Sequence, residues 1–110
     1  MAEQRQQLRE RVRTIVPTLV HYTDTVLLGE VWERAELSKR DRSLITIAAL
    51  VATYRPEALA DHLVLGRSNG VTYAEISELI THVAFYAGWP ASMAAARVAL
   101  ETLGEPAKLK

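Results

Sequence analysis

Side chains that can hold or move a proton stand at three places in otherwise apolar, helix-like segments. His62 follows Leu59 by three residues and precedes Gly66 by four, so a helix places all three on one face. An imidazole titrates near neutral pH and can donate or accept a proton. We interpret His62 as a candidate catalytic group; the alternative is a core histidine bonded to a backbone carbonyl. Gly66 leaves room over the imidazole, and its cost in a helix indicates a packing or site reason.

A second group lies between His82 and Pro90. His82 and Tyr86 are four residues apart, so their rings share one helix face, and Trp89 follows three residues later. An imidazole, a phenol and an indole can line a pocket for a flat ligand. The alternative is an aromatic plug in an ordinary core.

The third candidate is Glu30, which stands among apolar residues next to Trp32. A carboxylate beside an apolar face can serve as a general acid or base. The alternative is an exposed charge, or an ion pair with an arginine of the next helix.

A resident metal or cofactor is not expected. The chain has no cysteine, which excludes disulfides, thiolate catalysis and cysteine metal sites. His62, His82 and Glu30 could supply three ligands, but no metal-binding spacing such as HExxH supports such a site. No phosphate loop or nucleotide fingerprint is present.

Composition narrows the class of protein. The 110 residues have no formal net charge, 49% hydrophobic residues and 24% charged residues, as a globular domain does. The balance of charges argues against nucleic acid as a partner, because binding to nucleic acid depends on clustered Lys and Arg. The polar start is unlike a signal peptide, and the run Leu44–Ala52 is too short to span a bilayer. We expect a cytoplasmic protein that does not act at a membrane.

The elements that must position these side chains are all predicted to be helices, about six in number, in one domain over residues 1–110. Residues 1–15 form a peripheral N-terminal helix, and a second helix runs from Pro17 to about Arg34. The remaining helices cover about 39–51, 56–68, 73–87 and 91–103. The run 44–51 is apolar almost all round, which predicts a central helix covered on most sides.

Start and stop residues set these bounds. Ser38 is a plausible N-cap with Asp41 three residues on, and Thr72 with Glu75 forms a capping box. Gly70 is expected to end the preceding helix in a left-handed conformation.

Four motifs in this order resemble the carboxymuconolactone decarboxylase family, and the likeness covers about residues 16 to 103. They are Gly29–Arg34, Leu37–Leu50, His62 with Asn69–Thr72, and Ile80–Pro90. The resemblance implies an all-α, alkylhydroperoxidase D-like helical bundle that assembles as a homo-oligomer, a trimer or a hexamer. It also implies that peroxidase chemistry is absent, because Arg55 and Ala58 hold the places of that branch's two cysteines.

The resemblance implies a reaction as well, the decarboxylation of a small lactone or enolisable acid in aromatic-compound catabolism without a cofactor. His62 is then the proton donor or the group that stabilises the enolate, oriented or assisted by Glu30 or His82, and the resemblance leaves open which of the two histidines donates the proton. The substrate's ring and carboxylate would be bound by Tyr86, Trp89, Arg42, Asn69 and Trp32. The competing hypothesis is a small-molecule-binding or oligomeric scaffold protein of the same fold without catalysis.

Overall fold

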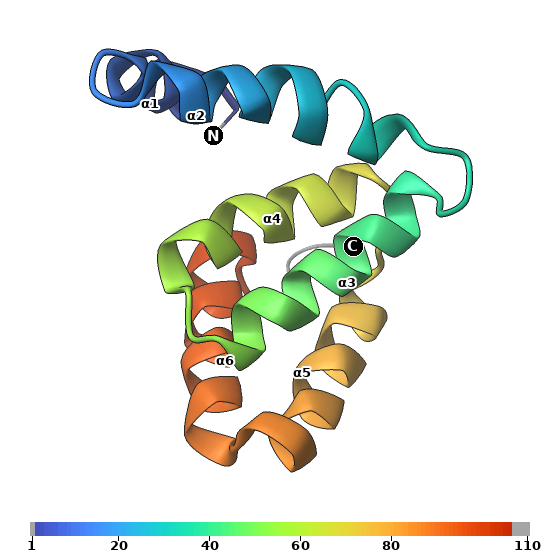
Figure 1. Ribbon diagram of the computed structural model, residues 1–110. Helices are drawn as coiled ribbons and strands as arrows, with labels where there is room; N and C mark the ends of the chain where they lie inside the picture. The colour runs from blue at the N-terminus through green and yellow to red at the C-terminus, as the bar shows by residue number, and fades with distance from the viewer. Residues whose placement is uncertain (1, 107–110) are drawn as a thin grey trace. The chain divides into compact units, whose positions relative to one another are not determined.

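The computed structural model describes residues 2–106 of the chain, with side chains from residue 6 onward. Its contacts divide into two compact units, an N-terminal unit of residues 1–39 and a C-terminal unit of residues 40–110. Six α-helices and no strand occur among the described residues, which confirms the all-α prediction. The α-helices are α1 (Ala2–Arg13), α2 (Pro17–Tyr22), α3 (Lys39–Ala52), α4 (Pro56–Ser68), α5 (Tyr73–Ala87) and α6 (Trp89–Leu103) (Figure 1). The prediction of one domain over the whole chain stays a prediction.

The N-terminal unit differs from the single helix predicted between Pro17 and Arg34. Helix α2 ends at Tyr22, a π-helical segment covers Thr23–Leu27, and a short 3-10 helix covers Val31–Glu33. The prediction of one continuous helix is therefore wrong. In the widened segment, the hydroxyls of Thr23 and Thr25 donate to the carbonyls of Leu19 and His21, at 3.1 and 2.8 Å.

Glycine is required just after this segment. A Cβ atom built on Gly29 would lie 2.6 Å from the carbonyl oxygen of Thr25, so a side chain cannot be accommodated there. Threonine hydroxyls that compete for backbone carbonyls bend helices, and glycine disfavours their continuation. These residues explain why the segment is irregular.

Asp24 ties the π-helical segment to α1. Its carboxylate accepts a hydrogen bond from Nη2 of Arg13 at 2.8 Å and lies 3.4 Å from Nε of Arg9. The hydrogen bond from Arg13, together with the positive charges of both arginines, lowers the pKa of Asp24. Because the folded pKa is depressed, the pair stabilises the unit above the unfolded pKa, and this contribution is lost as pH falls through the folded value.

We expect the Asp24→Asn variant to release α1, because an amide keeps the shape but not the charge. Trypsin should cleave after Arg9, Arg11 and Arg13 faster in this variant than in the wild type at pH 7.5. Carbon-13 titration of the Asp24 carboxyl group should give a midpoint below the ordinary value of about 3.9. Glu36→Gln is the matched control, because Glu36 is an exposed acid whose ion pair, at 3.6 Å, is with the exposed Arg34. Equal cleavage of the two variants would contradict the role of Asp24.

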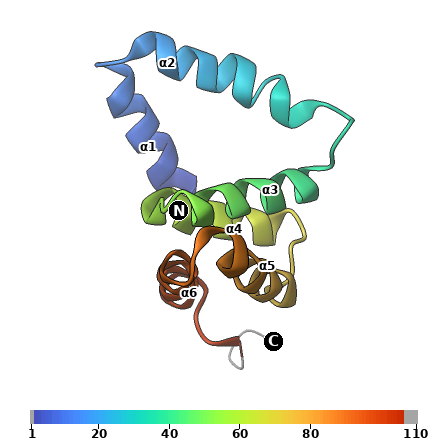
Figure 2. The ribbon, with the colours of Figure 1, turned by 60° about the horizontal axis from the view of Figure 1, so that its bottom comes forward.

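The C-terminal unit is built around one buried cluster. Helices α5 and α6 are antiparallel and are connected by a sharp turn at Gly88. Helix α4 packs against α6 (Figures 1 and 2). The buried residues of this cluster are Ile47, Val51, Leu59, Leu63, Val71, Ile76 and Ala95. Burial on α3 follows Ser43, Ile47 and Val51, whereas Ile45 is 55% exposed. Within residues 44–51 the exposed positions are Ile45 and Ala49, four residues apart on one strip, which agrees with the prediction that this helix is covered on most sides.

Two of the predicted start and stop signals form as expected in this unit, whereas the Ser38 cap of α3 stays a prediction. Thr72 and Glu75 form both hydrogen bonds of a capping box at the start of α5. Gly70 has a φ of 99°, the left-handed value expected of a helix stop. The carboxylate of Glu75 also pairs with the guanidinium of Arg40, which fastens the start of α5 to the start of α3. These contacts fix the turn that follows α4.

Candidate functional site

His62 lies on α4 beside the residues that pack against α3. Leu59, Leu63 and Gly66 are the buried positions of this helix, and His62 is half-buried with its Nδ1 atom fully covered. His62 therefore lies at the edge of the buried face of α4.

Gly66 allows the close approach of α4 to α3 one turn after His62. A Cβ atom there would lie 2.9 Å from Cδ1 of Ile47 and 3.7 Å from Cβ of Ser43. The two helices are therefore in contact at Ser43, next to Arg42, which is half-buried and has a covered Nε atom. The close approach of α3 and α4 explains why residue 66 is a glycine. It also means that the His62 imidazole and the Arg42 guanidinium belong to two helices that contact each other.

The aromatic group at the end of α5 is on the outer face of that helix. The rings of His82 and Tyr86 are 4.9 Å apart, as their spacing predicts. Trp89 pairs with Phe85 instead, at 5.8 Å and nearly edge-on. His82 is exposed, and Tyr86 and Trp89 are 81% and 58% exposed. These rings are not a plug in the core of the unit, and they form a surface of two aromatic pairs.

Glu30 and Trp32 belong to the N-terminal unit, where Glu30 is exposed and Trp32 is half-buried. Their assignment to the site stays a prediction. Within residues 2–106, no group of three or more His, Asp or Glu side chains is arranged to hold a metal ion. None of the described helices is both long and apolar enough to cross a bilayer.

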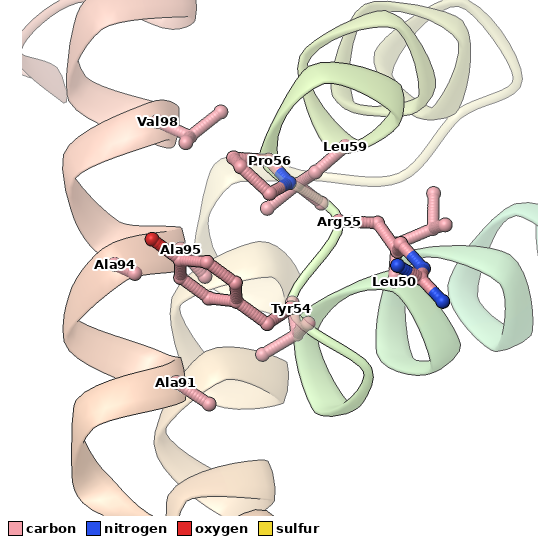
Figure 3. A pocket seen from close by; sticks show the side chains of 10 residues that line it. Leu50, Tyr54, Arg55, Pro56, Leu59, Ala91, Ala94, Ala95 and Val98 are labelled. Carbon is pink, nitrogen blue, oxygen red and sulfur yellow. The ribbon is translucent and has the colours of Figure 1, made fainter.

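The hollow between α3, α4 and α6 has an apolar lining that offers no acid or base apart from Arg55 and Tyr54 (Figure 3). The ring of Tyr54 lies over α6 beside Ala94 and Ala95 (Figure 3). Tyr54 has a φ of 54°, in the left-handed region that favours glycine. None of the predicted catalytic residues lines this hollow, so we do not interpret it as the site of chemistry.

Comparison with known proteins decides the family. Residues 17–101 match the model of the carboxymuconolactone decarboxylase family. The chain belongs to this family.

Two relatives of known activity are similar to parts of the chain. The 4-carboxymuconolactone decarboxylase of Acinetobacter baylyi is 51% identical over 73 residues, which are 66% of this chain and 54% of that protein. The nitrosuccinic acid decarboxylase of Metarhizium robertsii is 34% identical over 77 residues, which are 70% of this chain and 54% of that protein. The chain thus spans about half the length of the curated relatives it matches.

Asn69, in the motif that combines His62 with Asn69–Thr72, has a structural partner. Its Nδ2 atom donates a hydrogen bond of 3.0 Å to Oγ of Ser43, which is fully buried. The amide therefore satisfies a hydroxyl group in the interior and joins the end of α4 to α3. Its predicted role in substrate binding stays a prediction.

We expect Asn69→Ala to lower the free energy of unfolding by about 1–2 kcal/mol, because the buried Ser43 hydroxyl loses its donor. Urea denaturation followed by circular dichroism measures the change. Ser68→Ala is the matched control, since Ser68 is the exposed neighbouring residue. Similar stabilities of the two variants would contradict a supporting role for the amide.

Two buried serines were missed when the sequence was read for function. The Ser43 hydroxyl accepts the hydrogen bond from Asn69. The Ser92 hydroxyl donates a hydrogen bond of 2.8 Å to the carbonyl of Ile80, which joins α6 to α5. The available signal was a hydroxyl residue on an otherwise apolar helix face, as Ser92 is beside Ala95. Both serines join helices of the C-terminal unit.

Proposed function

We propose that this chain is a cofactor-independent carboxy-lyase that acts on a small carboxylic acid, with a lactone or other enolisable acid of aromatic catabolism as its substrate. The observation that carries the proposal is the likeness to two proteins whose names both state a decarboxylation, one of a lactone and one of a nitro acid. Family membership over residues 17–101 supports it. A scaffold without catalysis is not favoured, because it would leave this shared reaction type without a reason.

The two substrate types share one chemical requirement. When the bond to the carboxylate breaks, CO₂ leaves and the electron pair stays on carbon. A conjugated lactone carbonyl takes up this pair as an enolate, and a nitro group takes it up as a nitronate. The reaction then needs a group that stabilises the anion and a proton for carbon.

Helices α3 and α4 of the C-terminal unit carry both a residue that can donate a proton and a residue that can stabilise an anion. His62 delivers the proton to carbon in its imidazolium form and is reprotonated from solvent. The guanidinium of Arg42 binds a carboxylate or the developing oxyanion, for which its planar donors are suited. The half-burial of both side chains supports these roles, because charge interactions strengthen where water is reduced.

The exposed rings of His82, Tyr86 and Trp89 support assembly as a homo-oligomer. Contiguous apolar surface of this kind is typical of interfaces and ligand sites. We propose a homo-oligomer, a trimer or a hexamer, in the cytoplasm. A neighbouring subunit would cover these rings. The covered rings would then bind the ring of the substrate.

Turnover of matched acids tests the proposed reaction. The full chain is incubated with 4-carboxymuconolactone, nitrosuccinic acid and succinic acid, and released CO₂ is measured. We expect release from at least one of the first two acids and none from succinic acid, which has no group to take up the electron pair. Absence of release from both activated acids would contradict the proposal, as would equal release from succinic acid.

A further inference from the structure

A cavity of about 290 Å³ opens between α5 and α6, near the start of α5 and the end of α6. We call it the α5–α6 cavity. Its apolar walls come from both helices and comprise Ile76, Ile80, Ala96, Ala99, Leu100 and Leu103. Neither His62 nor Arg42 lines it, so the cavity is separate from the residues proposed for catalysis.

Small side chains on both helices leave this space open. Ser77 and Thr81 are four residues apart and share one face of α5. Ala96 and Ala99 are three residues apart and share one face of α6. All four line the cavity. The hollow thus follows from the sequence, because larger side chains at these positions would fill the gap between the two helices.

The chain that follows α6 adds a third wall. Gly104 ends this helix with a φ of 81°, in the left-handed region that favours glycine. After this turn the ring of Pro106 lines the cavity. Proline has no backbone N–H, so this wall adds apolar surface without adding a donor.

Tyr73 stands at one end of the cavity, where its ring is held in place from outside. The guanidinium of Arg67, which does not line the cavity, lies over the ring at 3.8 Å from its centroid. Arg67 also donates a hydrogen bond of 2.8 Å to the carbonyl of Val71. These two contacts fix an aromatic wall before any ligand arrives.

The polar groups of the lining are hydroxyls. The hydroxyl of Thr81 donates a hydrogen bond of 2.9 Å to the backbone carbonyl of Ser77, so its oxygen remains available as an acceptor. The hydroxyl of Ser77 forms no hydrogen bond with any other described residue, and it can donate or accept. The cavity therefore offers both a donor and an acceptor to a hydroxyl group of a ligand.

No charged side chain among residues 6–106 lines the cavity. An ionised molecule that entered it would lose hydration without gaining an opposite charge, which is costly. The lining therefore favours an uncharged ligand. The carboxylic acid of the proposed reaction is an anion at neutral pH, so it does not match this cavity.

We propose that the α5–α6 cavity binds a small neutral aromatic alcohol, with its rings between the apolar walls and its hydroxyl beside those of Ser77 and Thr81. The volume of about 290 Å³ is at the lower end of the range for small-molecule pockets, which fits a molecule of one or two rings. The ring of Tyr73 favours an aromatic ligand, because offset and edge-on ring contacts add to the burial of apolar area. The site goes beyond the proposed function, since its ligand is not the acid that loses CO₂.

Two probes of the same ring system test the preference for a neutral ligand. The full chain is titrated at pH 7 with 2-naphthol, which is neutral, and with 2-naphthoic acid, which is ionised. Methyl resonances of the protein are followed by NMR. We expect 2-naphthol to shift those of Ile76, Ile80 and Ala96 saturably, and the acid to bind at least about tenfold more weakly.

The variant Ala96→Leu places a larger side chain in the cavity from an exposed position of α6. It should weaken the binding of 2-naphthol at least about tenfold, because the leucine occupies the space of the rings. Ala58→Leu is the matched control, since Ala58 is an exposed alanine of α4 that does not line the cavity. Circular dichroism should show equal helix content in both variants.

Three results would overturn the proposal. The first is the absence of saturable shifts with 2-naphthol at millimolar concentration, or shifts confined to methyl groups outside the lining. The second is equal affinity for 2-naphthoic acid, which would show that the lining does not select a neutral ligand. The third is equal affinity of the Ala96→Leu variant and the Ala58→Leu control, which would place the binding elsewhere on the chain.

Discussion

Replacing His62 with alanine is expected to lower kcat/KM for the acid that the chain decarboxylates by about 10²–10⁴-fold, with helix content unchanged. This is the usual contribution of a positioned general acid. His62 is half-buried on α4 and does not belong to the buried cluster of that helix, so removing its ring should not prevent folding. Steady-state rates with purified wild type and variant measure the effect.

The control for this prediction is the chain's exposed histidine in α2. His21→Ala removes an imidazole from the N-terminal unit and should leave turnover unchanged. His62→Gln adds a second comparison, because an amide keeps hydrogen bonding but cannot transfer the proton. Turnover by the alanine variant equal to that of the wild type would remove His62 from the mechanism.

The helices of the C-terminal unit could be predicted because their ends are set by local chemistry. The Thr72–Glu75 capping box involves residues three apart, and the left-handed Gly70 stops the preceding helix without help from distant residues. Both signals can be read from neighbouring positions in the chain. The predicted bounds of α4 and α5 accordingly agree with the structure.

The irregular segment after α2 could not be predicted in the same way. Apolar residues at helical spacing indicated one continuous helix to about Arg34. The outcome depends on hydroxyl groups of Thr23 and Thr25 that bond to carbonyls one turn back, and on the close approach of the Gly29 backbone to Thr25. Hydrophobic spacing carries no information about such competition.

Contacts between residues of the candidate site could be predicted where both residues belong to one helix, but not where they belong to different helices. The spacing of His82 and Tyr86 gave their ring contact, yet it did not show that both rings face outward. Nor did spacing reveal that Asn69 would reach Ser43, 26 residues away. Which side of a helix is buried depends on helices far along the chain, so residues of the site can be named from the sequence before their neighbours can.

Replacing Gly66 with valine is expected to lower the free energy of unfolding by about 2 kcal/mol or more. The Cβ atom alone would lie 2.9 Å from Cδ1 of the fully buried Ile47, and valine adds two further carbons. Overpacking of a core typically costs about 1–3 kcal/mol, and removing a helix glycine recovers less than about 1 kcal/mol. Urea denaturation measures the change, with Ala58→Val at an exposed position of α4 as the control for helix propensity.

A rescue experiment separates this close contact from a general loss of stability. Ile47→Val removes the Cδ1 atom that a residue at position 66 would meet, and by itself should cost about 0.5–1.5 kcal/mol. Gly66→Ala should then stabilise the Ile47→Val protein, because the methyl group enters the vacated space and the helix gains propensity. If alanine at position 66 destabilised both backgrounds equally, the contact between α3 and α4 would not be the reason for glycine. Glycine would then serve the space around His62, one turn earlier on α4.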